Sequence, residues 1–112
     1  MTHEFADTDA VKAADRVVAA IRARDWQRLQ SLLTASHDAA GSVAPWQEAT
    51  ELPQILDGPE VQTIPPFLLR YPGKTLVRYP MKARLDGQKL EVIVERRGAE
   101  FFAIDFWGFG WP

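Results

Sequence analysis

The best candidates for acid–base chemistry in this sequence are Tyr79 and His37. Tyr79 is the only phenol on the inward face of its predicted strand, and a buried phenol can donate a hydrogen bond or a proton to a substrate. His37, followed by Asp38, lies in a predicted loop where a pocket rim would lie. We favour the alternatives, a core tyrosine with a satisfied hydroxyl and a solvated histidine, and therefore assign no catalytic residue.

Two carboxylates, Glu91 and Asp105, are predicted to be cross-strand neighbours on the outer face of the sheet. Paired carboxylates can split their pKa values and so perform acid–base catalysis. Lys82, predicted on the other side of Glu91, favours the alternative of a row of ion pairs.

Metal and cofactor chemistry have little support. The sequence contains no cysteine and no second histidine at ligand spacing from His37, so we assign no metal. The glycine-rich dinucleotide and P-loop motifs and the serine hydrolase motif are also missing, and we expect no cofactor.

The C-terminal stretch 105–112 is unusually aromatic. Phe106 is expected in the core, whereas the aromatic side chains that follow it need a partner. They either fold back over the outer sheet face, which is predicted to carry Ala103, or dock on a second subunit, and we keep both interpretations open. The predicted interface residues are Trp107, Phe109, Trp111, Phe101 and Ile93.

Helical periodicity dominates the first half of the chain. Apolar residues recur at helical spacing from Asp9 to Arg24, and Asp25 is placed to cap a second, shorter helix that fades near Ala35. The small and polar stretch 34–44 indicates a loop, and Pro45 fits the first turn of a third helix carrying Trp46.

The second half alternates as strands do. A short strand is predicted over 60–64, followed by longer strands over 74–85, 88–96 and 100–107. Asp86-Gly87 is the strongest hairpin signal, and a two-residue turn there places Lys82 opposite Glu91 and Arg78 opposite Glu95. Tyr79 and Met81 then face inward with Val92.

Two further features shape the predicted sheet. A three-residue connection through Arg97, Gly98 and Ala99 sets Phe102 opposite Val94 and turns it inward, which keeps the apolar faces together. Pro80 lacks a ladder donor, so we expect a bulge or an edge position there, which helps the sheet to curve.

Length and composition set the class of protein. The 112 residues are predicted to form one domain, helical over 1–57 and a sheet over 58–112. A net charge of −2 with interleaved charges argues against nucleic acid as a partner, and no apolar run is long enough for a membrane span. The lack of cysteine and of a leader pattern favours the cytoplasm.

Both ends of the chain resemble a known family. The segment Ile21–Leu33, IRARDWQRLQSLL, resembles the helix, Asp turn and Leu-rich second helix of the nuclear transport factor 2-like superfamily. The segments 90–98 and 100–107 are similar to its closing hairpin. The resemblance implies a cystatin-like α+β cone, with two or three helices on the concave face of a three- to four-stranded antiparallel sheet, and leaves function open. The family's hairpin after the second helix is missing, which implies a smaller or closed pocket.

These patterns predict a non-catalytic binding or interaction module, dimeric through its outer sheet face. Its small apolar ligand would lie in a pocket lined by Trp46, Tyr79, Met81 and Phe102. One alternative is an isomerase- or cyclase-like enzyme acting on an apolar cyclic substrate, with Tyr79 as donor and a carboxylate or His37 as base. The other is an accessory or inhibitor subunit with no pocket.

Overall fold

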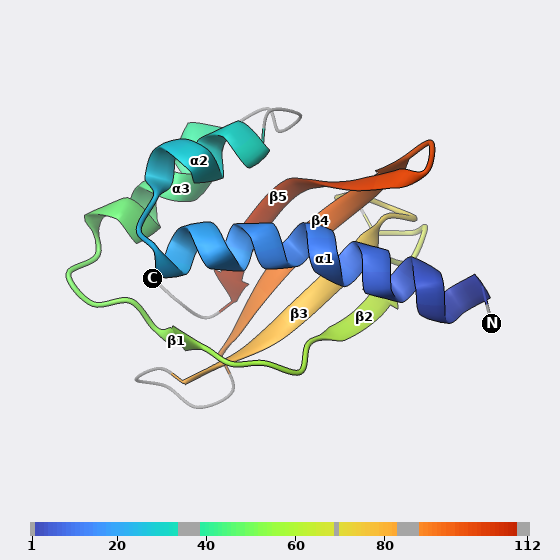
Figure 1. The fold of residues 1–112 in the computed structure, drawn as a ribbon, viewed down its shortest axis with the longest axis horizontal. Helices are drawn as coiled ribbons and strands as arrows, with labels where there is room; N and C mark the ends of the chain where they lie inside the picture. The colour runs from blue at the N-terminus through green and yellow to red at the C-terminus, as the bar shows by residue number, and fades with distance from the viewer. Residues whose placement is uncertain (1, 34–38, 69, 83–87, 110–112) are drawn as a thin grey trace.

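Helices precede a curved antiparallel sheet in the computed structural model, which describes residues 2–33, 39–68, 70–82 and 88–109 (Figure 1). The expected α+β class is confirmed. None of the described helices is long and apolar enough to cross a membrane. The elements in these residues are α1 (Thr2–Arg22), α2 (Trp26–Leu32), α3 (Ala39–Glu48), β1 (Gln54–Ile55), β2 (Glu60–Thr63), β3 (Thr75–Lys82), β4 (Lys89–Arg97) and β5 (Glu100–Phe109).

Backbone geometry at Arg24 and Asp25 bends the chain between α1 and α2. Arg24 has a φ of +54° and donates its N–H to the carbonyl of Ile21, while the N–H of Asp25 bonds to the carbonyl of Ala20. These two bonds form a Schellman ending. The Asp25 side chain then accepts a bond of 3.1 Å from the N–H of Arg28 and caps α2, as predicted.

The third helix begins earlier than predicted. It starts at Ala39, so the expected loop is wrong for residues 39–44, and Pro45 lies inside the helix rather than in its first turn. The proline removes one helical bond, but the helix buries Val43 and Trp46, and such packing outweighs local propensity. His37 lies outside the described residues.

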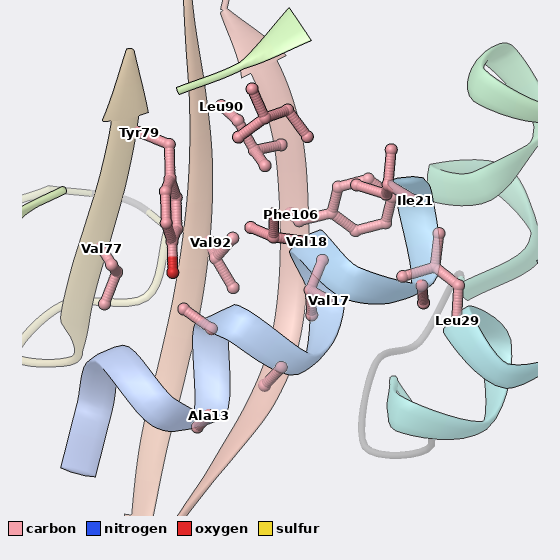
Figure 2. Close-up of a cluster of buried hydrophobic side chains, with 14 of the residues drawn as sticks. Ala13, Val17, Val18, Ile21, Leu29, Val77, Tyr79, Leu90, Val92 and Phe106 are labelled. Atoms are coloured by element: carbon pink, nitrogen blue, oxygen red, sulfur yellow. The ribbon is translucent and has the colours of Figure 1, made fainter. Parts of the chain in front are cut away.

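One apolar core fills the space between the helices and the sheet (Figure 2). Small residues on α1, among them Ala13, Ala14 and Val17, let the helix approach β3, β4 and β5 closely. Phe106 is 1 % exposed and its ring lies 5.8 Å from that of Trp46 on α3. The predicted helix face and the inward strand faces therefore meet.

Both β1 and β2 pair with the same edge of β3, which gives five strands where three or four were expected. Between them lies Pro80, whose carbonyl accepts a bond from Leu56 at the end of β1. The N–H of Met81 points the other way, to Gln88. Because N–H groups alternate along a strand, the position where Pro80 lacks a donor faces the gap between β1 and β2.

The predicted register of β3 against β4 is wrong by four residues. Arg78 lies opposite Glu91, not opposite Glu95, and Pro80 lies opposite Lys89. An even shift keeps every side chain on its predicted face, so Tyr79 still faces inward. The predicted turn at Asp86-Gly87 lies outside the described residues.

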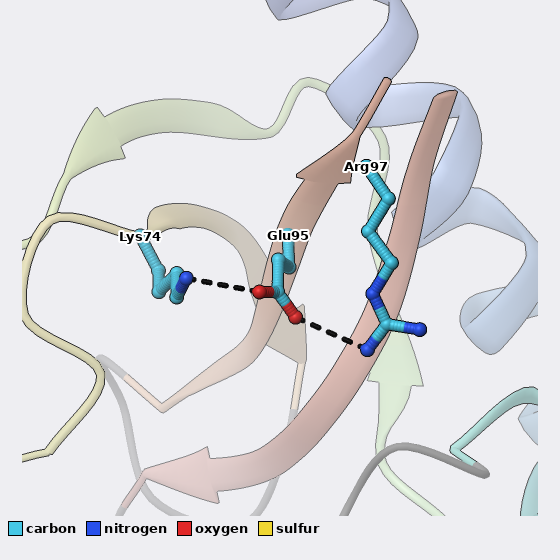
Figure 3. Close-up of polar contacts among 3 residues, drawn as sticks. All are labelled: Lys74, Glu95 and Arg97. Carbon is cyan, nitrogen blue, oxygen red and sulfur yellow. Dashed lines mark hydrogen bonds and ion pairs between the residues drawn. The ribbon is translucent and has the colours of Figure 1, made fainter. Parts of the chain in front are cut away.

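Glu95 finds other cations in this register (Figure 3). Its carboxylate accepts bonds of 3.0 Å from Lys74 and 3.2 Å from Arg97. These bonds, the one from Lys74 foremost, lower the pKa of Glu95. The ionised carboxylate therefore stabilises the fold above its unfolded pKa, and the contribution is lost as the pH falls through the folded pKa.

The predicted register of β4 against β5 is wrong as well. A two-residue turn through Gly98 and Ala99 joins Arg97 to Glu100, and Phe102 lies opposite Glu95 rather than Val94. Gly98 has a φ of +63°, which the first central position of a tight hairpin turn demands.

A β-bulge restores the apolar match that the shorter turn would otherwise lose. Val94 lies opposite Ala103 while Ile93 lies opposite Asp105, so Ile104 is an extra residue in β5. Before the bulge the faces are opposite to those predicted. Phe101 packs on the helix-side core, and Phe102 is 38 % exposed with the Arg97 guanidinium 5.5 Å above its ring.

Substitutions of the adjacent residues Phe101 and Phe102 test the register of β4 against β5. We expect Phe101→Ser to lower the free energy of unfolding by about 2 kcal/mol, because it removes a half-buried ring from the core. Phe102→Ser should cost less than about 0.5 kcal/mol, since its ring is surface-exposed. Urea denaturation measures both variants. A larger loss of unfolding free energy for Phe102→Ser than for Phe101→Ser would support the register predicted from the sequence instead.

Candidate functional site

A groove of about 470 Å³ opens on the sheet face opposite the helices. Its floor comes from Ile64, Leu76 and Ile93. Together with Ile104 these residues form a second apolar cluster that contains no helix residue, and each is at most 6 % exposed. The connection between β2 and β3 forms one wall, through Pro65 and Leu68. The site is therefore apolar at its base.

Asp105 anchors the connecting segment to the sheet. It is 5 % exposed, and its Oδ2 accepts a bond of 2.6 Å from the hydroxyl of Tyr71 and lies 3.9 Å from the Arg70 guanidinium. Its Oδ1 accepts the backbone N–H of Phe106 at 2.8 Å. Both oxygens are therefore occupied, as a buried carboxylate demands.

Glu91 is held in a second polar cluster on the same face. Its Oε2 accepts bonds of 3.2 and 3.1 Å from Nε and a terminal nitrogen of Arg78. Its Oε1 accepts the indole N–H of Trp107 at 3.1 Å. Glu91 lies opposite Trp107 and Asp105 opposite Ile93, so the predicted direct pairing of the two carboxylates, and of Glu91 with Lys82, is wrong.

Trp107 joins the two polar clusters. Its ring stacks on that of Tyr71 with centroids 6.3 Å apart, and Arg70 lies 5.7 Å from the Tyr71 ring and 5.9 Å from the Trp107 ring. Tyr71 has a φ of +54°, which is uncommon for a bulky residue. This strain is offset by the stack and by the bond to Asp105.

The groove is suited to binding rather than to proton transfer. Burial, and then the bond to Asp105, raise the pKa of Tyr71, so this phenol stays protonated at neutral pH. Asp105 lies beside Arg70 and Glu91 lies beside Arg78, so the charges of these four side chains cancel. Across the described ranges, histidine and carboxylate side chains form no cluster of three that could hold a metal ion.

The inner-face candidates lie in the core. Trp46, Tyr79 and Met81 are 2, 2 and 6 % exposed, and none of them lines the outer groove or the hollow of about 180 Å³ between α1 and the β4–β5 hairpin. The Tyr79 hydroxyl donates a hydrogen bond to Asp15 on α1. Burial, followed by that bond, raises the pKa of Tyr79.

The predicted interface residues separate between the two faces. Trp107 and Ile93 belong to the outer face, as expected, but Ile93 is fully buried there. Phe101 and Ala103 belong to the inner core. Only the backbone of Phe109 is described, and Trp111 lies outside the described residues.

The sequence reasoning missed Arg70 and Tyr71, which the fold brings beside Trp107. They lie in a connection bounded by prolines and glycine, where no periodicity assigns a face to a side chain. The one sequence signal for this site was the presence of two large side chains with polar ends, Arg70 and Tyr71, in a short segment rich in turn residues.

Comparison of the chain with models of protein families, with curated proteins and with solved structures finds no match. By its fold and its site, the protein is an α+β domain with a groove on its outer sheet face.

The two tyrosines of the chain should both resist ionisation. The pKa of each is raised above 10.0 in the folded protein, so the protonated phenols stabilise the fold below pH 10.0, and this contribution is lost as the pH rises further. Ultraviolet absorbance should show tyrosinate forming at a higher pH in the folded protein than in the chain unfolded by urea. In the Tyr79→Phe variant Tyr71 is the only tyrosine left. If it titrates with a pKa near 10.0 in the folded state, the buried contact to Asp105 is contradicted.

Tyr79→Phe tests whether the inner phenol is structural. We expect a loss of about 1 kcal/mol in the free energy of unfolding, the usual cost of one hydrogen bond, because Asp15 is exposed enough to be hydrated in its absence. Urea denaturation measures the change, with Asp15→Asn as the matched variant. A loss above about 3 kcal/mol would show that the pair contributes far more than one bond.

Proposed function

We propose that this chain is a non-catalytic binding module whose outer-face groove receives an uncharged, apolar side chain of a protein partner. The observation that carries the proposal is the groove itself, with a buried apolar floor and walls whose arginines are already paired with carboxylates. Such a surface offers dispersion and apolar burial to a ligand, and each of its arginines has a carboxylate beside it.

The pairing of charges favours an uncharged occupant. An acidic group would have to draw Arg78 away from Glu91, and a basic group would compete with Arg78 for the same carboxylate. Either exchange would leave a buried charge without its partner, which is costly. An aromatic or aliphatic group avoids this cost.

The polar groups of the site support binding over catalysis. Tyr71 and Trp107 donate to carboxylates, and Tyr79 donates to Asp15 on the other face. A general acid or base needs a group free to exchange a proton with substrate. The isomerase- or cyclase-like alternative therefore has no supporting contact in the described residues.

We also propose that the chain is related to the nuclear transport factor 2-like superfamily. The bend at Asp25, the helices that precede the sheet and the closing β4–β5 hairpin support this placement. In that arrangement Trp46, Tyr79 and Met81 fill the space where a family pocket would lie, so we propose that binding occurs at the outer face. A cytoplasmic setting fits the lack of cysteine.

A capped phenylalanine, N-acetyl-phenylalanine amide, tests the proposal directly. In NMR titrations it should shift the amides of Leu76 and Ile93 and the indole N–H of Trp107, with a dissociation constant on the order of 1–10 mM for a single side chain. Capped alanine should give no such shifts.

Leu68→Glu and Leu56→Glu form a matched pair for this titration. Leu68 is 46 % exposed at the groove, and Leu56 is 37 % exposed and does not line it. The carboxylate at position 68 should abolish the shifts, while that at position 56 should leave them unchanged. Shifts that survive Leu68→Glu, or that arise elsewhere, would contradict the proposed site.

A further inference from the structure

We propose that the partner presents its apolar side chain on an extended strand, which adds antiparallel to the edge of β2 beside the outer-face groove. The inference rests on the proposed function and adds the conformation of the partner and the backbone contacts that recognise it. Three features of the described residues carry it: an open strand edge, backbone groups that point away from the sheet, and an acid at the same edge.

The sheet has two borders, and they differ in exposure. In Figure 1, β1 and β2 lie along the lower border and β5 along the upper one. Residues 103–106 of β5 are each at most 6 % exposed, and both α2 and α3 contact this strand. In β2, by contrast, Glu60, Gln62 and Thr63 are exposed, and Val61 is half-buried. An added strand therefore has access to β2 but not to the middle of β5.

The backbone of β2 presents hydrogen-bonding groups at this open border. Ile64, the residue after β2, donates its N–H to the carbonyl of Lys74 at 2.8 Å, which sets the alternation of the strand. The backbone groups of Gln62 therefore also face β3, and those of Val61 and Thr63 point away from it. No described strand pairs with β2 on that side. The edge thus offers two N–H groups and two carbonyls, which strand addition uses.

The groove lies on the outer face next to this edge. Gln62 in β2 and Ile64 just after it line the groove, which continues over β3 and β4 to Trp107 on β5. In an added antiparallel strand, the residue opposite Gln62 points to the same face and belongs to a pair without backbone bonds, in which side chains approach most closely. A phenylalanine there reaches its diagonal neighbour Ile64. Pairing at the edge therefore directs one apolar side chain into the groove.

Two prolines limit the length of the pairing. Pro59 precedes β2 and Pro65 follows Ile64, and neither can donate a hydrogen bond to an added strand. Such a short edge resists pairing with the sheet of another molecule. It still sets which residue of a short extended segment lies opposite Gln62. The edge therefore contributes register, and the groove contributes apolar burial.

Glu60 adds a preference for charge. It is exposed, and Arg78, which lies opposite it on β3, is bonded to Glu91. In the added strand, the residue opposite Glu60 comes two positions after the residue opposite Gln62 and points to the same face. A lysine or arginine there pairs with Glu60 outside the groove, whereas an acid is repelled. The partner segment is therefore an apolar residue followed two positions later by a basic one.

The capped heptapeptide TTFTKTT tests the inference alongside N-acetyl-phenylalanine amide. In NMR titrations its dissociation constant should be about tenfold lower than that of the single residue, because main-chain bonds add to the burial of the ring. The peptide, but not the single residue, should slow hydrogen exchange at the amides of Val61 and Thr63. The peptide with glutamate in place of lysine should bind about threefold more weakly, since it places a like charge opposite Glu60.

Thr63→Pro removes one donor from the open edge. The N–H of Thr63 points away from β3, so the proline leaves the bonds between β2 and β3 intact. This variant should lose the tenfold advantage of the heptapeptide and should bind N-acetyl-phenylalanine amide as the wild type does. Thr63→Val keeps the N–H and the β-branched shape, so as the matched control it should retain the full affinity for the peptide.

The outcomes separate this inference from the function on which it rests. Strand addition is overturned if Thr63→Pro binds the heptapeptide as the wild type does, or if the peptide leaves exchange at Val61 and Thr63 unchanged. The exchange measurement uses the wild-type chain and does not depend on how the variant folds. If capped phenylalanine still shifts Leu76 and Ile93 of the wild type, the groove binds apolar side chains and only the backbone contact is wrong. If neither ligand shifts these amides, both proposals fail.

Discussion

The single extra residue in β5, Ile104, determines what each face of the sheet carries. Before it, the two-residue turn directs Phe101 toward the helices, and after it Phe106 points the same way. The bulge also leaves Ile104 and Asp105 together on the outer side, where Ile104 packs with Ile64, Leu76 and Ile93 and Asp105 holds Tyr71. Without this extra residue, Phe101 and Phe106 could not both point toward the helices.

The faces of β3 and β4 were predictable from the sequence, but their register was not. Cations recur every four residues at Lys74, Arg78 and Lys82, and acids recur at Glu91 and Glu95. Pairing Arg78 with Glu91 or with Glu95 therefore satisfies the charges equally well, and both choices keep the apolar alternation. The turn signal at Asp86-Gly87 favoured one register, whereas the pairing of the strands in the structure is the other.

The outer site was predictable only in part, for a related reason. Trp107 and Ile93 lie on a periodic strand, so their outer position could be derived. Tyr71 and Arg70 lie in a connection where direction depends on long-range contacts, and the φ of Tyr71 is one that local propensity would not choose. Trp46 and Tyr79 were correctly placed on the inner side, but the tight approach of α1 leaves them in the core rather than in a pocket.

The same contacts that hold the outer face together also preform its groove. Tyr71 is fixed by Asp105 and by its stack on Trp107, and Trp107 is fixed in turn by Glu91, so the walls are ordered before any ligand arrives. An occupant then loses its own freedom but does not have to order the site, which favours binding by even a small group. This advantage is greatest for an uncharged occupant, because a charged one beside Glu91 would compete with the Arg78–Glu91 pair that shapes the groove.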